Sequence, residues 1–299
     1  MQVEQRTAPA LAKANGIELC YDTFGAPDAP PLILVMGLAA QMIAWDDEFC
    51  ASLAGRGYRV IRFDNRDIGL STHFASAGVP DVQAAFMAAM QGKPVAAPYL
   101  LSDMADDVVG LLDALDIDAA HVVGASMGGA IAQTLAIHHP ARLRTLTSIM
   151  ATSGAPGLPP PTPEVLAMLF KPAPADQAAY FESYVQTWKL LRAGSFPLDE
   201  ARDLTRAGQN FARGLDPAGV ARQLVAIVAS GSRKAALAAV KVPTLVIHGD
   251  VDPLVPLACG IDVAESVPGA QLLVIEGMGH ALPIPMWPRI IDAISAHAI

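Results

Sequence analysis

The pattern G-x-S-x-G occurs in this chain at Gly124, Ser126 and Gly128. A short apolar run that is typical of a buried strand ends at Gly124, and a helical pattern begins after Ser126. So tight a turn leaves no room for side chains at the two glycines and pushes the serine hydroxyl out above the sheet. It also points the backbone N–H of Met127, at the positive end of the new helix, toward the place where a carbonyl oxygen would become an oxyanion. We therefore interpret Ser126 as a nucleophile; a turn that only caps a helix is the alternative.

A serine hydroxyl attacks a carbonyl at neutral pH only if a base takes its proton, and histidine has the matching pKa. The chain contains seven histidines. Of these, His121, His138 and His139 are expected at the opposite end of a parallel sheet from Ser126. His280 follows the last predicted strand in a glycine-flanked loop and is free to reach over the strand ends. We therefore predict that His280 is the base.

The histidine in turn needs a carboxylate that holds its tautomer and stabilises the imidazolium. In the chain order Ser, acid, His, this carboxylate must lie between Ser126 and His280. None follows the strand that ends at Ala151, so the next strand must supply it. Asp250 and Asp252 both qualify by position, and spacing does not choose between them. One is expected to orient His280, and the other to cap the turn through hydrogen bonds to its own backbone.

The elements that must position these residues follow an alternating pattern. Short apolar runs alternate with helical patterns, which implies an α/β fold with a mostly parallel central sheet, flanking helices and right-handed crossovers. Continuous apolar runs such as residues 32–36 suit strands that are covered on both faces. The predicted strands cover residues 17–24, 32–36, 58–63, 121–124, 143–151, 242–247 and 271–275.

This alternation is interrupted between residues 152 and 234. Closely spaced prolines mark an exit from the sheet, and the amphipathic helices predicted after them need a surface to cover. We predict a core of residues 1–151 and 235–299 and a helical lid of residues 152–234 inserted over the strand ends. Aromatic residues of the lid would line an apolar pocket or pack the lid on the core; they are Phe170, Phe181, Trp188 and Phe211. No cluster of lid arginines is visible.

Composition limits the classes of partner. The 299 residues carry a formal net charge of −9 without a basic cluster, which argues against nucleic acid or anionic lipid as a partner.

The best candidate for a membrane span, residues 31–45, is interrupted by Gly37 and Gln41 and is shorter than the roughly 20 apolar residues that a bilayer requires. No signal peptide is visible in residues 1–16, and three scattered cysteines do not suggest a metal site. We expect a cytoplasmic protein; its oligomeric state is not readable from these features.

Three segments together resemble the α/β-hydrolase superfamily. They are Gly124 to Gly128, the Gly-Asp-Val-Asp-Pro-Leu-Val-Pro run at 249–256, and Gly279-His280. The resemblance covers the chain from about residue 17 to the end and implies the α/β-hydrolase fold. In that family the acid is the one just before Pro-Leu-Val-Pro, which implies Asp252.

The same resemblance extends to the loop after the strand at 32–36. Met36-Gly37-Leu38 is similar to the family's first oxyanion loop, in which a histidine-glycine pair usually stands. Here Met36 replaces that histidine. The resemblance implies that the backbone N–H of Leu38 is the second oxyanion donor, beside that of Met127. Because this donor is a backbone group, the loss of the histidine need not remove it.

A narrower resemblance concerns the first half of the chain. Residues 36–38, Trp45 and the run from Phe63 to Ser71 resemble a subgroup of carboxylesterases that includes the anthracycline methylesterases, in which residues 65–71 are mainly a structural turn. The resemblance implies two-step acyl transfer by a serine esterase on small, uncharged carboxylic esters, with no metal or organic cofactor.

Three other functions remain open on the same fold. A cofactor-free haloperoxidase or perhydrolase uses the same triad, and peroxide then replaces water in releasing the acyl group. A ligand receptor or carrier keeps the triad without turnover. A carbon-carbon bond hydrolase that acts on acidic dienoates is less expected, because no cluster of lid arginines is visible.

Overall fold

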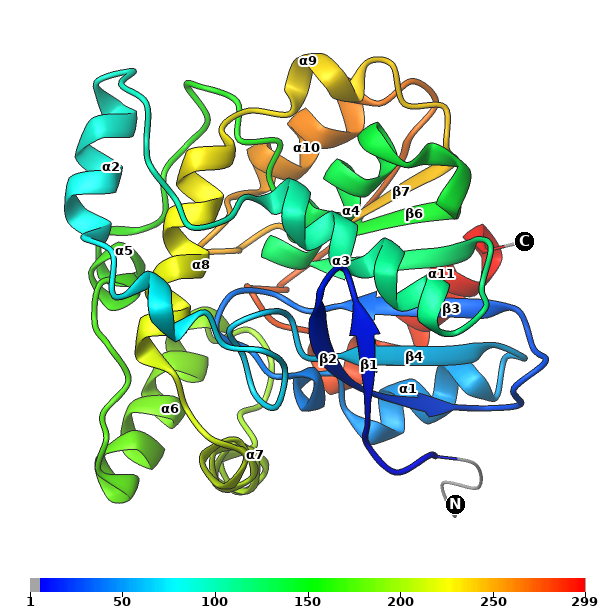
Figure 1. Ribbon diagram of the computed structural model, residues 1–299, viewed down its shortest axis with the longest axis horizontal. Helices are drawn as coiled ribbons and strands as arrows, with labels where there is room; N and C mark the ends of the chain where they lie inside the picture. Colours follow the sequence, from blue (N-terminus) through cyan, green and yellow to red (C-terminus); the bar gives the residue numbers. More distant parts are fainter. Residues whose placement is uncertain (1–5, 299) are drawn as a thin grey trace.

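The computed structural model describes residues 6–298, which form one eight-stranded sheet with helices on both faces (Figure 1). The strand order is β1-β2-β4-β3-β5-β6-β7-β8. The pairs β1–β2 and β2–β4 are antiparallel, and all later neighbours are parallel. The strands are β1 (Ala10–Ala14), β2 (Ile17–Phe24), β3 (Pro31–Val35), β4 (Arg59–Phe63), β5 (Ala120–Ala125), β6 (Leu143–Ile149), β7 (Thr244–Gly249) and β8 (Gln271–Ile275).

The helices divide into those that cover the sheet and those inserted between β6 and β7. The first group comprises α1 (Asp47–Ala54), α3 (Leu101–Ala114), α4 (Met127–His138), α10 (Leu257–Ser266) and α11 (Trp287–His297). The inserted segment contains α5 (Pro163–Leu169), α6 (Gln177–Leu191), α7 (Glu200–Arg213), α8 (Pro217–Ser230) and the short α9 (Lys234–Leu237). A further helix, α2 (Val82–Met90), precedes α3 and packs against α8.

The central strands are apolar on both faces, as their continuous hydrophobic runs predict. In β3, Leu32 and Leu34 pack on the side of α1 and α11, whereas Ile33 and Val35 pack on the side of α3 and α4. This alternation follows from the two-residue period of a strand. The expected mostly parallel sheet with helices on both sides is therefore confirmed.

The first strand, β1, was not predicted. It pairs with β2 through a hairpin whose two turn residues, Asn15 and Gly16, have φ angles of 49° and 77°. Positive φ at both central residues is what a tight hairpin turn requires, and an Asn-Gly pair is the usual sequence for it. That pair was the signal that could have revealed the strand.

Three of the inserted helices, α5, α6 and α7, begin with a side-chain cap. The side chain of Thr162 caps α5, and those of Asp176 and Asp199 cap α6 and α7. These helices lie at the left of Figure 1 together with α2. Helix α8 contacts the segments that follow β3 and β4, so it lies at the carboxyl edge of the sheet.

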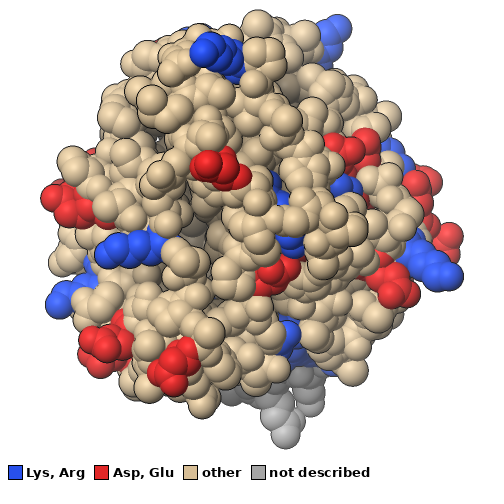
Figure 2. All heavy atoms as spheres, turned by 60° about the vertical axis from the view of Figure 1, so that its left-hand side comes forward, with Lys and Arg blue, Asp and Glu red and all other residues tan. Residues whose placement is uncertain are grey.

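No helix within residues 6–298 combines the length and the apolar character needed to span a bilayer. The face that carries the inserted helices shows mostly uncharged side chains and is hollowed near its middle (Figure 2).

Candidate active site

Ser126 lies at the joint between β5 and α4, in a backbone conformation that few side chains adopt. Its φ angle is 57° and its ψ angle is −121°. A Cβ atom added at Gly124 would lie 2.1 Å from the carbonyl oxygen of Gly128, and one added at Gly128 would lie 2.1 Å from that of Val35. Neither position can carry a side chain, so both glycines are required by close backbone approach. The strain at Ser126 is typical of a functional turn.

The structure brings Ser126, His280 and Asp252 together in one chain of hydrogen bonds. Ser126 Oγ lies 2.9 Å from His280 Nε2, and His280 Nδ1 lies 2.7 Å from Asp252 Oδ2. His280 and Asp252 are buried, whereas Ser126 is partly exposed. The three residues follow β5, β7 and β8, whose carboxyl ends meet at one edge of the sheet.

The loop that carries His280 is held by an inserted helix, a support that the sequence did not indicate. The backbone N–H of His280 donates to the carbonyl oxygen of Leu191, the last residue of α6, at 2.7 Å. A Cβ atom at Gly279 would lie 2.4 Å from the same oxygen, so glycine permits this approach. Helix α6 therefore helps to fix the imidazole above the sheet edge.

The two aspartates that spacing left open differ in their contacts. Asp252 uses one carboxylate oxygen for His280 and the other for the N–H groups of Leu254 and Val255, at 2.9 and 2.8 Å. Asp250 Oδ1 instead accepts the N–H of Gly277, at 2.6 Å. The expectation that one aspartate orients the histidine and the other caps its own turn is wrong in that Asp252 makes both kinds of contact.

The other histidines have different partners. His121 Nδ1 lies 2.9 Å from Thr145 Oγ1 inside the sheet, and His139 Nε2 lies 2.7 Å from Asp106 Oδ1. His248 is buried beside the triad, with Nε2 2.7 Å from the carbonyl oxygen of Val255. Burial lowers its pKa, which favours a neutral imidazole behind the Asp252 carboxylate.

The loop after β3 passes directly over the serine. A Cβ atom at Gly37 would lie 3.0 Å from that of Ser126. Within residues 6–298, the backbone N–H groups of Leu38 and Met127 have no hydrogen-bond acceptor in the protein. Asn65 Nδ2 donates to the carbonyl oxygen of Met36 at 2.8 Å and so holds the start of this loop. The resemblance implied that residues 65–71 are mainly a structural turn, and the sequence did not indicate this contact of Asn65.

A cavity of about 100 Å³ adjoins the site. Its lining includes Met36, Ala125 and Ala281, which are chain neighbours of Gly37, Ser126 and His280, and the aromatic rings of Trp45, Phe49, Tyr184, Trp188 and Trp287. Among the aromatic lid residues considered from the sequence, Trp188 lines this cavity. The others pack elsewhere: Phe181 and Phe211 against Tyr180, and Phe170 against Phe86 of α2.

Arginines of the inserted segment gather at this cavity, although no cluster was visible in the sequence. Arg192, Arg202 and Arg206 are separated along the chain but share its wall. Each guanidinium is paired: Arg192 with Asp203 through two bonds of 2.6 Å, and Arg202 and Arg206 with Asp46. The expected absence of an arginine cluster is therefore wrong, but these cations are already balanced by carboxylates.

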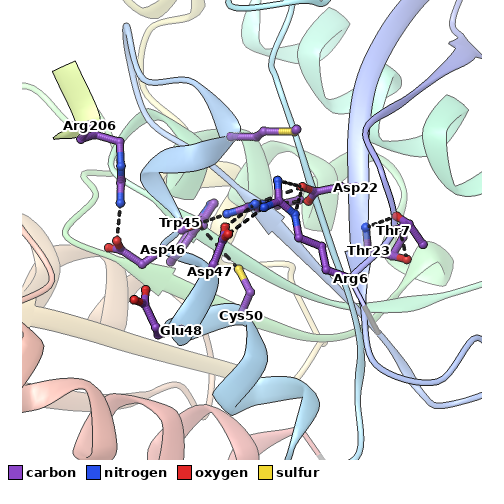
Figure 3. Close-up of polar contacts among 12 residues, drawn as sticks. Arg6, Thr7, Asp22, Thr23, Trp45, Asp46, Asp47, Glu48, Cys50 and Arg206 are labelled. Carbon is purple, nitrogen blue, oxygen red and sulfur yellow. Dashed lines mark hydrogen bonds and ion pairs between the residues drawn. The ribbon is translucent and has the colours of Figure 1, made fainter. Parts of the chain in front are cut away.

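Asp46, Asp47 and Glu48 at the start of α1 form the other side of this charged region. Figure 3 shows Asp46 facing Arg206 of α7 and Asp47 facing Arg6. An open cleft of about 530 Å³ lies between these three carboxylates and the arginines of α7. Ion pairs therefore attach the inserted helix α7 to the start of α1.

One group of potential metal ligands occurs in the described residues, and it includes none of Ser126, Asp252 and His280. Donor atoms of Asp67, His73 and Asp216 lie within 4.8 Å of one another. Arg222 forms ion pairs with both aspartates, at 2.7 and 3.0 Å. Its guanidinium supplies the positive charge that a metal ion would bring, so the residues fit an ion-pair network better than a metal site.

Comparisons with known proteins agree with this architecture. A family model described as alpha/beta hydrolase fold matches residues 30–285. The rhodomycin D methylesterases DauP of Streptomyces sp. (strain C5) and DnrP of Streptomyces peucetius are each 32% identical over 305 residues, which covers 94% of this chain and 95% of the relative. The crystal structure of an enol-lactonase from Burkholderia xenovorans matches with a TM-score of 0.72 and 24% identity, over 96% of this chain and 99% of that one. The chain therefore belongs to the alpha/beta hydrolase family.

Proposed function

We propose that the protein is a serine hydrolase that cleaves uncharged carboxylic esters through an acyl-enzyme intermediate. The observation that carries the proposal is the continuous hydrogen-bonded chain from Ser126 Oγ through His280 to Asp252. Nucleophile, base and orienting carboxylate stand within hydrogen-bond reach of one another in that order, which is the requirement for activating a serine.

In the proposed reaction, Ser126 Oγ attacks the ester carbonyl carbon while His280 Nε2 takes the hydroxyl proton. The negative charge that develops on the carbonyl oxygen is stabilised by the free N–H groups of Leu38 and Met127. The tetrahedral intermediate collapses, and His280 returns the proton to the departing alkoxide, which leaves as an alcohol. A water molecule then attacks the acyl-serine by the same route and releases the carboxylic acid. Asp252 orients the imidazole of His280 and stabilises the imidazolium in both halves of the reaction.

The charge at the adjoining cavity supports an uncharged substrate. Three guanidinium groups line this cavity, and three carboxylates, Asp46, Glu48 and Asp203, are paired with them. A carboxylate-bearing substrate, such as a dienoate, would have to compete with these ion pairs. The aromatic lining favours an apolar group instead. Methyl esters are the first substrates to test, because two relatives are named methylesterases.

We further propose that residues 152–234 act as a lid over the core of residues 1–151 and 235–299. Two contacts support this role: α6 bonds to the backbone of His280 at the sheet edge, and Trp188 of the same helix lines the adjoining cavity. Such a cover excludes water from the reacting groups and shapes the space for the substrate.

The test is hydrolysis of short p-nitrophenyl and methyl esters by the wild type and by Ser126→Ala. We expect the substitution to lower kcat at least about 10⁴-fold, because it removes the nucleophile. A fluorophosphonate probe is expected to label the wild type and not the variant. Ser52→Ala is the matched control, since the Ser52 hydroxyl bonds only to the carbonyl oxygen of Glu48 on α1. Full hydrolysis by Ser126→Ala would rule the mechanism out.

The same assays separate the alternatives that share the triad. Steady multiple turnover is expected of an esterase, whereas a single slow turnover with retained product would indicate a ligand receptor. Peracid formation from the same ester in the presence of hydrogen peroxide, faster than hydrolysis, would indicate a perhydrolase.

A further inference from the structure

The oxyanion loop contains a strained residue that is not a glycine. Ala39 has a φ angle of 62° and is exposed to solvent. It is the third residue of a four-residue turn, 37–40, which is closed by a hydrogen bond of 3.4 Å from Ala40 N–H to the carbonyl oxygen of Gly37. A type II turn requires a positive φ at this position, and glycine usually supplies it. For alanine the same conformation costs free energy, so something else must hold the turn.

The group that contacts Ala39 is the side chain of Gln223, from the inserted helix α8. Gln223 Oε1 accepts the backbone N–H of Ala39 at 3.2 Å, and Gln223 Nε2 donates to the carbonyl oxygen of Arg66 at 2.9 Å. The Gln223 side chain is fully buried. Because one end of the amide faces a donor and the other faces an acceptor, only one orientation of the amide satisfies both.

Leu38 lies between two such anchors. Asn65 holds the carbonyl oxygen of Met36 on one side, and Gln223 holds the N–H of Ala39 on the other. The N–H of Leu38 itself has no acceptor within residues 6–298, and the hydrogen bond that closes the turn is long. The direction of this N–H therefore depends on the anchors at either side.

We propose that Gln223 is a positioning residue for the oxyanion donor at Leu38. It keeps the Leu38–Ala39 peptide in the orientation that the positive φ of Ala39 demands. Without the acceptor, Ala39 relaxes to a negative φ and the Leu38–Ala39 peptide rotates. The turn then no longer fixes the preceding Gly37–Leu38 peptide, which carries the N–H of Leu38. The inference rests on the proposed function, because it assigns Leu38 to an oxyanion hole. The geometry of the turn at residues 37–40 therefore also depends on how the inserted helix α8 packs on the core.

The first test is Gln223→Met, which keeps the length of the side chain and removes both hydrogen bonds. Loss of one oxyanion donor costs about 10²- to 10³-fold in rate, so a displaced donor is expected to lower kcat about 10- to 100-fold. KM is expected to stay within about threefold, because the donor acts on the charge that develops in the transition state. In a crystal structure of the variant, Ala39 is expected at a negative φ.

The second test is the double variant Gln223→Met/Ala39→Gly. Glycine adopts positive φ without the penalty that alanine carries, so kcat is expected to rise several-fold above that of Gln223→Met alone. A residue that merely stabilised the lid would give no such recovery. Arg222→Lys is the control on the same helix: Arg222 binds Asp67 in the turn after β4 and does not touch the oxyanion loop. It is expected to lower Tm while kcat stays unchanged.

Unchanged kcat in Gln223→Met, a loss confined to KM, or no recovery by Ala39→Gly would overturn the proposal. So would an unchanged loop in the crystal structure of the variant, whatever its activity. Failure of the proposed function is a separate result, because it would appear as full hydrolysis by Ser126→Ala.

Discussion

Asp252 divides its two carboxylate oxygens between two tasks. Oδ2 faces the imidazole of His280, and Oδ1 receives two backbone N–H groups of the turn that follows. The turn therefore fixes the carboxylate, and the carboxylate fixes the tautomer of the imidazole. With Nδ1–H donating to Asp252, Nε2 is left unprotonated toward Ser126, which is the state that can accept a proton.

Replacing Asp252 by asparagine tests this division. The amide oxygen of Asn is expected to keep the bonds to Leu254 and Val255, so the amide NH₂ would face His280 and impose the wrong tautomer. We expect kcat to fall about 10³- to 10⁴-fold with little change in Tm, measured by ester hydrolysis and thermal unfolding. Asp250→Asn is the matched control, because it keeps an acceptor for Gly277 and should change kcat by less than about threefold. Equal losses in both variants would contradict the assignment.

At the scale of elements, helix α7 is attached to the core by charged side chains. Arg202 and Arg206 bind Asp46 at the start of α1, and Arg213 at the end of α7 binds the buried Asp64. Figure 3 shows Arg206 of α7 directed toward Asp46. Asp46 precedes α1, yet its side chain makes no capping bond to that helix. Its carboxylate is used to hold the inserted helix instead.

Asp46→Asn is therefore expected to loosen α7 without unfolding the sheet. Arg206 loses its charged partner in a half-buried setting, and Arg202 keeps only the exposed Glu48, so the free energy of unfolding should fall by about 1–2 kcal/mol, between the values typical of exposed and buried pairs. Trypsin should also cleave faster at Arg202 and Arg206. The control is Asp292→Asn, which breaks an exposed pair with Arg56 and should cost less than about 0.5 kcal/mol. Equal stability losses, measured by urea denaturation, would show that α7 is held by other contacts.

At the scale of the whole molecule, chain order predicts which loops share an edge of the sheet, but it does not predict which side chains meet across it. Ser126 and His280 could be proposed because each follows a parallel strand, and such strands end together. For the acid, strand order left both Asp250 and Asp252, and only the family resemblance favoured Asp252. The contact between Gln223 and Ala39, which lie 184 residues apart, could not be named, because Gln223 lies within a helix and not at the end of a strand. Hydrophobic periodicity gives the buried face of a helix, not the partner of a polar residue on it.

The same reasoning explains why the arginine cluster was missed. Arg192 directly follows α6, whereas Arg202 and Arg206 lie on α7, and only the packing of these two helices brings the three side chains to one cavity. The sequence also did not decide whether the aromatic residues of the inserted segment line a pocket or pack against other side chains. Phe181 and Phe211 pack against each other, and Phe211 also packs against Tyr180. Neither outcome is encoded in the spacing of the residues within one helix.

The stability of the whole fold is expected to depend on pH through a histidine inside the sheet. His121 is 3% exposed on β5, and burial, together with the charges of Arg144 and His297, lowers its pKa to about 4. An unfolded chain binds this proton near pH 6.5, so between pH 6.5 and 4 the unfolded state holds more protons than the folded one. The contribution is therefore fully present above pH 6.5 and is lost as the pH falls toward 4. Over that window the wild type should lose stability relative to His121→Gln by up to about 1.4 kcal/mol per pH unit.

The measurement is urea denaturation of the wild type and His121→Gln at several pH values from 4.5 to 8. His248 titrates in both proteins, so its contribution cancels in the difference between the two curves. That difference contains the titration of His121 together with its coupling to the charge of His297. The glutamine is expected to cost some packing against Tyr58, which lowers stability equally at every pH. The informative quantity is therefore the slope of the difference, not its size. Parallel curves across pH 6.5 to 4.5 would mean that His121 accepts a proton in the folded sheet as easily as in the unfolded chain.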